Sequence, residues 1–198
     1  MPPATATALI RWGLWLGCGV PGIVLWMRWQ AGHLGVVPSE VLLHQTGRMA
    51  LLLLMATLAL GFVLSLLRWK PLYAARRPLG VWTFLYACAH GGVWFWLDQG
   101  AVGEFALMEM REMLHLKLGL AALLLMLPLA LSSVDAAPRL IGFRHWKRLH
   151  LLVWPAAALV LAHAWVVSRF GSPLVLWLTG VMLVVMATRL RAALRHRK

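Results

Sequence analysis

Charged residues are scarce in this sequence. They make up 13% of the chain, whereas 62% of its residues are hydrophobic and its mean hydropathy is +0.78. This composition is not that of a soluble globular domain, and we expect the lipid bilayer to be the solvent in which the chain folds. No polar stretch is long enough to hold a nucleotide-binding or flavin-binding fold, so we expect any such domain on a separate protein.

Acidic residues in particular are few. The chain has six, and all of them lie between its long apolar runs: Glu40, Asp98, Glu104, Glu109, Glu112 and Asp135. A proton-coupled transporter usually carries carboxylates inside its membrane spans. The absence of acids from the apolar runs therefore argues against a pump.

Cysteine is nearly absent as well. The only two, Cys18 and Cys88, fall in different apolar runs. Two buried thiols on separate helices do not make a disulfide framework, so we interpret both as small apolar side chains.

Long apolar runs are what the sequence has in abundance. Six of them are long enough, or nearly so, to cross the hydrocarbon core as helices, which satisfy their own backbone groups there. They cover residues 9–27, 50–67, 79–97, 114–131, 149–167 and 174–187. The sequence thus predicts an all-α integral membrane protein, a six-helix bundle in which residues 1–198 form one transmembrane domain.

The net charge of +13 is distributed by connection, which favours membrane topology over nucleic-acid binding as its explanation. The second connection, the fourth connection and the tail are basic, with Arg68, Lys70, Arg76, Arg77, Arg139, Arg144, Lys147, Arg148, Arg189, Arg191, Arg195, Arg197 and Lys198. The third connection has four acids against Arg111 alone. Because cytoplasmic loops retain Lys and Arg, we predict that both termini and the even-numbered connections are cytoplasmic.

Three of the apolar runs carry histidines; His115 marks the exterior end of the run 114–131, and we assign it no chemistry. The run 149–167 holds His150 and His163 and no other ionisable residue, and the run 79–97 holds His90. Polar side chains at membrane depth are costly and usually serve a site, and neutral imidazole is the commonest protein ligand for haem iron. The alternative is that each histidine only hydrogen-bonds to a neighbouring helix.

Depth separates His90, His150 and His163. With about 1.5 Å of rise per residue, His90 lies about 16 Å and His163 about 21 Å from the cytoplasmic start of parallel spans. We therefore predict that His90 and His163 ligate one iron from opposite sides. His150 lies about 19 Å nearer the cytoplasm and roughly 140° away around an ideal helix, so it belongs to another site or to none, although Pro155 between the two can rewind the helix.

His44 and Arg48 end the first connection, just before the second apolar run. They stand four residues apart in the segment HQTGR and share one face if this segment is helical. Such a pair at the outer boundary suits haem propionates or a quinone headgroup. The alternative is an interfacial anchor without a ligand.

Three segments together resemble a known family. HQTGR at residues 44–48, RRPLG followed by His90, and WKRLH followed by His163 are similar to the MsrQ family, the haem-binding membrane subunits of periplasmic methionine sulfoxide reductase systems, within the ferric reductase and NADPH oxidase superfamily. In that superfamily, helices three and five each supply two histidines to two b-type haems. His90, His163 and His150 match three of these positions, while the fourth falls near Arg76 or Arg77.

The resemblance implies a function as well. It implies a bacterial inner-membrane b-type cytochrome with one haem and, if His150 finds a partner, a second. It would pass electrons from the quinone pool or a cytoplasmic flavin reductase to a periplasmic molybdopterin-containing subunit that reduces protein methionine sulfoxide. The resemblance also implies FMN, for which the sequence has no motif. Another ferric-reductase-like or quinol-linked cytochrome would share the histidines, whereas a structural or assembly protein would not need them.

Overall fold

The computed structural model describes residues 3–67 and 69–195, so Arg68, Arg197 and Lys198 of the charge analysis lie outside the described residues. Within these two ranges the regular structure is entirely helical, which confirms the all-α prediction. In chain order the elements are α1 (Pro3–Gly17), α2 (Val20–Gln30), α3 (Pro38–Leu67), η1 (Lys70–Ala75), α4 (Arg76–Val93), η2 (Trp94–Asp98), α5 (Gly103–Glu112), α6 (Leu114–Leu131), α7 (Ala137–Leu140), α8 (Phe143–Leu149), η3 (His150–Leu152), α9 (Val153–Val167) and α10 (Pro173–Arg195).

Four helical segments are long and apolar enough to cross a membrane. They cover Ala4–Gln30, Pro38–Leu64, Leu114–Leu131 and Phe143–Val167, which contain the first, fourth and fifth predicted runs and all but the last three residues of the second. The sixth run lies in the shorter apolar helix Pro173–Thr188, and the third forms α4 and η2 and is not among the four. Among the described residues, length and composition therefore support four of the six predicted spans.

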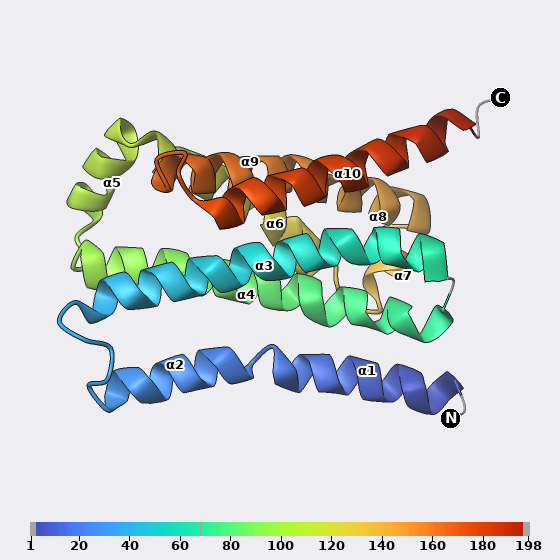
Figure 1. The fold of residues 1–198 in the computed structure, drawn as a ribbon, viewed down its shortest axis with the longest axis horizontal. Helices are drawn as coiled ribbons and strands as arrows, with labels where there is room; N and C mark the ends of the chain where they lie inside the picture. Colours follow the sequence, from blue (N-terminus) through green and yellow to red (C-terminus); the bar gives the residue numbers. More distant parts are fainter. Residues whose placement is uncertain (1–2, 68, 196–198) are drawn as a thin grey trace.

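The long helices lie side by side in layers (Figure 1). α1 and α2 run end to end along one edge, α3 and α4 lie next to them, and α6, α9 and α10 form the opposite side. The connections α2–α3 and α9–α10 gather with α5 at one end of the bundle. The α3–α4 connection, α7, α8 and both ends of the chain gather at the other.

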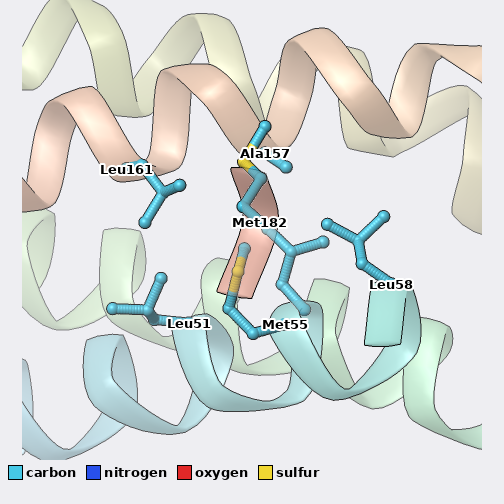
Figure 2. Close-up of a cluster of buried hydrophobic side chains, with 7 residues drawn as sticks. Leu51, Met55, Leu58, Ala157, Leu161 and Met182 are labelled. Carbon is cyan, nitrogen blue, oxygen red and sulfur yellow. The ribbon is translucent and has the colours of Figure 1, made fainter. Parts of the chain in front are cut away.

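The core lies where α3, α9 and α10 meet. Figure 2 shows Leu51, Met55 and Leu58 of α3 facing Ala157 and Leu161 of α9 and Met182 of α10. Ala156 and Ala157 are fully buried. Small side chains let membrane helices approach closely, so these alanines set the distance between α9 and its neighbours.

The first span is broken into α1 and α2 around Gly17, Cys18 and Gly19. Pro21 has no N–H to donate to the preceding turn, so the helical ladder is interrupted there. α4 supplies the missing partners: the Tyr86 hydroxyl donates to the Cys18 carbonyl (2.8 Å) and accepts from the Gly22 N–H (2.9 Å). Trp82 Nε1 donates to the Trp15 carbonyl (3.0 Å). These bonds satisfy backbone groups that lipid would leave unpaired.

Helix α3 begins twelve residues before the predicted second run, at Pro38 rather than residue 50. Its first turn carries Pro38 and Glu40, a residue type preferred at the first helical position followed by an acid that favours the positive end of the helix dipole. The segment HQTGR is therefore part of a helix and not of the preceding connection. Because this segment is polar, a hydropathy pattern places the start of the helix too late, at residue 50.

Candidate haem-binding site

His90 on α4 and His163 on α9 face each other across the bundle. Their ring centres are 6.0 Å apart and their planes are nearly perpendicular, at 88°. Both side chains are half-buried. The structure therefore brings together the two histidines that the sequence analysis paired by depth, although 72 positions of chain separate them.

Each of the two rings is held through the same nitrogen. Nδ1 of His90 lies 2.9 Å from the carbonyl oxygen of Leu43 on α3. Nδ1 of His163 lies 2.7 Å from the carbonyl oxygen of His115 on α6. A carbonyl oxygen only accepts, so both Nδ1 atoms carry the proton and donate. In a neutral ring this leaves the lone pair on Nε2, the atom free to bind a metal.

The spacing of the two rings fits a shared metal. A metal–imidazole bond is about 2 Å long and the ring centre lies about 1 Å beyond the nitrogen, so two rings on opposite sides of one metal have centres about 6 Å apart. The observed 6.0 Å agrees with this value. Within residues 3–67 and 69–195, no group of three or more His, Cys, Asp or Glu is placed to hold a metal ion. Two imidazoles without further protein ligands suit haem, whose porphyrin would supply the remaining ligands.

His150 lies apart from this pair. It begins the 3-10 turn η3, just ahead of α9, where Pro155 removes a helical donor and tightens the backbone. Its ring lies on Trp146, with centres 4.2 Å apart, and its Nδ1 is 3.0 Å from the Trp146 carbonyl. The predicted rewinding of the helix near Pro155 is present, but it does not turn His150 toward His90 or His163.

His44 and Arg48 are both exposed on α3. His44 directly follows Leu43, whose carbonyl holds His90, and it is close enough to His90 to interact with it electrostatically. The two residues thus lie on the segment of α3 that contacts α4 near the paired histidines.

Four residues contact the two rings without having been assigned a role from the sequence: Leu43, Gly47, His115 and Gly119. The His115 ring is 5.9 Å from the His163 ring, and its carbonyl holds His163. Gly47 abuts the ring of His90, and Gly119 abuts the ring of His163. His115 and Gly119 contact His163 only because α6 packs along α9, so no local pattern indicates them.

A short polar cluster closes the end of the bundle beyond His90. The carboxylate of Glu109 on α5 accepts from Trp94 Nε1 (3.3 Å) and from Gln99 Nε2. Trp94 begins the π-helical turn η2 that follows α4. This cluster fastens α5 to the helix that carries His90.

Comparison with known proteins identifies the family of the chain. Residues 46–161 match the family model of the ferric reductase like transmembrane component. Over 192 residues the chain is 31% identical to the heme-binding subunit MsrQ of the protein-methionine-sulfoxide reductase of Rhodospirillum rubrum, covering 95% of this chain and 90% of that protein. Its counterparts from Ralstonia nicotianae (33% identity; 83% and 76% covered) and Deinococcus radiodurans (36%; 76% and 77%) are also similar.

The chain is thus a multi-pass membrane protein of the ferric reductase-like transmembrane class. Within that class it belongs to the MsrQ family, which the sequence analysis predicted.

Proposed function

We propose that this chain is a membrane b-type cytochrome that passes electrons across the bacterial inner membrane to a periplasmic molybdopterin-containing reductase of protein methionine sulfoxide. Its relatives are named as heme-binding subunits of protein-methionine-sulfoxide reductase, which supports a role in electron delivery. The residues that reduce methionine sulfoxide would then lie on the partner, and repair of oxidised periplasmic proteins would be the outcome.

The facing pair of His90 and His163 is the observation that carries the proposal. When bound, haem supplies one-electron chemistry, and two histidine ligands favour electron transfer over oxygen binding. In this proposal the chain's own residues do the rest. Leu43 and His115 hold the Nδ1 protons, Nε2 of each ring is left for the iron, and the apolar helices exclude water.

We propose the full predicted topology as part of this function: six spans, one haem-binding domain over residues 1–198, and both termini in the cytoplasm. The charges at the two ends of the bundle support it. Lys70, Arg76, Arg139, Arg144 and Lys147 lie at the end with the α3–α4 connection, α7 and α8, whereas α5 at the other end carries Glu104, Glu109 and Glu112. Under the positive-inside rule the first end is cytoplasmic and His90 lies nearer the periplasm.

Three further assignments belong to the same proposal. His44 and Arg48 are proposed to bind haem propionates or a quinone headgroup, because both are exposed beside the segment that holds His90. His150 is proposed as a ligand of an inner haem, since its Nδ1 also meets a carbonyl and leaves Nε2 free. The quinone pool or a cytoplasmic flavin reductase is the proposed donor. FMN is an expectation from the family resemblance alone.

An optical spectrum tests this function. The full-length protein, purified from membranes of cells supplied with a haem precursor, is expected to show a low-spin b-type spectrum that changes on reduction with dithionite. Acid extraction followed by flavin fluorescence tests for FMN in the same sample. A preparation without haem, or with a high-spin haem that binds carbon monoxide readily, would contradict the two-histidine site.

A further inference from the structure

One arrangement of three groups occurs twice at the candidate site. On α3, the Leu43 carbonyl accepts from His90, and Gly47 stands four residues further along. On α6, the His115 carbonyl accepts from His163, and Gly119 again stands four residues further along. The two cases use different helices and different histidines, but the spacing of carbonyl and glycine is the same.

The spacing of four has a geometric reason. In an α-helix the carbonyl of residue i accepts from the N–H of residue i+4, so Leu43 is paired with Gly47 and His115 with Gly119. A side chain that bonds to the same carbonyl must approach past the Cβ position of residue i+4. Glycine has no Cβ, and the approach is open.

The distance from a Cβ built at each glycine to the nearest ring atoms shows how close the histidine lies to the backbone there. A Cβ added at Gly47 would lie 2.9 Å from both Nδ1 and Cε1 of His90. A Cβ added at Gly119 would lie 3.2 Å from Nδ1 of His163. Nonbonded heavy atoms normally approach to about 3.5–4.0 Å, so an alanine would push either ring away from its carbonyl, and more strongly at position 47.

We propose that Gly47 and Gly119 are positioning residues for the two haem-ligating histidines. Each glycine lets an imidazole rest on a helical carbonyl that already accepts a backbone N–H, which fixes the Nδ1–H tautomer and the direction of Nε2. The effect of the glycines on haem binding rests on the proposed function. Their effect on the orientation of the rings rests on the contacts of the rings with the two carbonyls alone.

The hydrogen bond between each ring and its carbonyl also affects how tightly the imidazole would bind iron. A carbonyl that accepts from Nδ1–H raises the basicity of the ligating imidazole, and losing such an outer hydrogen bond typically weakens metal binding by roughly 10- to 100-fold. Gly47→Ala and Gly119→Ala are therefore expected to weaken haem binding within that range and to raise the midpoint potential of the haem that remains. Because the clash is closer at position 47, Gly47→Ala is expected to have the larger effect.

Nuclear magnetic resonance of the Nδ1 protons of the two rings tests this proposal directly. The full chain, labelled with ¹⁵N-histidine and reduced with dithionite so that a two-histidine iron is diamagnetic, is expected to show hydrogen-bonded Nδ1–H signals for His90 and His163. Nuclear Overhauser contacts of each Nδ1 proton with α3 or with α6 assign the signals without removing either histidine. Gly47→Ala should displace only the His90 signal, and Gly119→Ala only the His163 signal.

Matched controls are available in the same helical bundle. An alanine Cβ at Gly80 on α4 or at Gly180 on α10 meets nothing within 4 Å. Gly80→Ala and Gly180→Ala should keep both Nδ1–H signals, the haem content and the midpoint potential.

The outcomes separate the two ideas. Unchanged Nδ1–H signals in Gly47→Ala and Gly119→Ala, or equal changes in the controls, would overturn the positioning role even if haem is bound. If the signals follow the expected pattern but the wild-type protein binds no low-spin haem, the glycines do position the rings. The proposed function is then overturned instead.

Discussion

In His90 and His163 the two ring nitrogens have different partners. Nδ1 of each ring is committed to a backbone carbonyl, at 2.9 Å for His90 and 2.7 Å for His163. A histidine with one nitrogen occupied in this way is oriented before any ligand arrives, so little rotamer freedom remains to be lost on binding. His150 is held similarly but by a carbonyl of its own segment, Trp146, four residues before it.

Substitution of single histidines separates the two positions. His90→Ala or His163→Ala is expected to abolish the haem shared by this pair, because each change leaves one axial position empty. His150→Ala is expected to spare that haem and to remove only an inner one, since its ring lies on Trp146 and away from the pair. Reduced-minus-oxidised spectra and haem content per protein measure the difference.

Substitution of His33, which lies in an exposed turn and has no proposed role, provides the control. His33→Ala should retain the full haem content. Loss of all haem in His150→Ala together with retention in His163→Ala would show that the histidines are paired differently.

Sequence reasoning found the ligand candidates but not their supports. His90 and His163 stand out because ionisable residues are rare at membrane depth, and the rise per residue is enough to compare their heights. The carbonyls of Leu43 and His115 have no such signature, since every residue has one. Gly119 is one of 17 glycines, and only the packing of α6 along α9 distinguishes it.

At the scale of single elements, the broken first span depends on α4. The Tyr86 side chain is only 5% exposed, and its hydroxyl serves both Cys18 and Gly22 across the break. Tyr86→Phe keeps the ring but leaves a backbone carbonyl and an N–H unpaired. We expect a loss of about 1–3 kcal/mol in the free energy of unfolding.

Thermal unfolding in a mild detergent, followed by circular dichroism, measures this loss. Tyr73→Phe is the matched control, because Tyr73 is 52% exposed and its contact with Arg76 involves the ring and not the hydroxyl. Equal stability of the two variants would mean that water or detergent satisfies the break as well as Tyr86 does.

The ends of the helices were harder to predict than their centres. Apolar run length alone gave residues 114–131 for the fourth span, and α6 has these bounds. It missed the start of α3 at Pro38, because polar residues on a helix that extends beyond the hydrocarbon resemble a loop in a hydropathy pattern. It also missed the break between α1 and α2, since the residues around Gly17 and Gly19 are as apolar as their neighbours.

At the scale of the whole molecule, the two ends of the bundle differ in charge and in how their connections are fastened. Arg77 and Asp135 form an ion pair at 2.7 Å that joins the first turn of α4 to the segment before α7. At the other end, Glu109 joins α5 to Trp94 and Gln99. The first contact joins segments that are distant in the sequence, whereas the second fastens neighbouring parts of one connection.

The acidic end offers a test of partner docking. Asp98, Glu104 and Glu112 are exposed there, whereas Glu109 is half-buried and bonded within the cluster. If these three acids steer a basic patch on the periplasmic reductase, replacing them together by Asn or Gln should slow haem reoxidation by that reductase roughly tenfold at low ionic strength. The difference should shrink as salt rises, because surface charges are screened.

Stopped-flow measurement of haem reoxidation across a salt series gives this rate. Asp135→Asn, at the opposite end of the bundle, is the control for a change in net charge away from this surface. Equal rates and equal salt dependence in the triple variant and the wild type would leave the acids as topology determinants only, and would direct the search for a docking surface to His44 and Arg48.

The glycines at 47 and 119 have a consequence for engineering this protein. In an ordinary helix, replacing glycine by alanine gains about 1 kcal/mol of helix propensity, and programmes that seek thermostable membrane proteins choose such positions first. Here the same exchange would place a methyl group 2.9 Å from one ring and 3.2 Å from the other. The clash is therefore expected to cancel the gain in helix propensity and to weaken haem binding, so positions 47 and 119 should be left as glycine when the protein is stabilised.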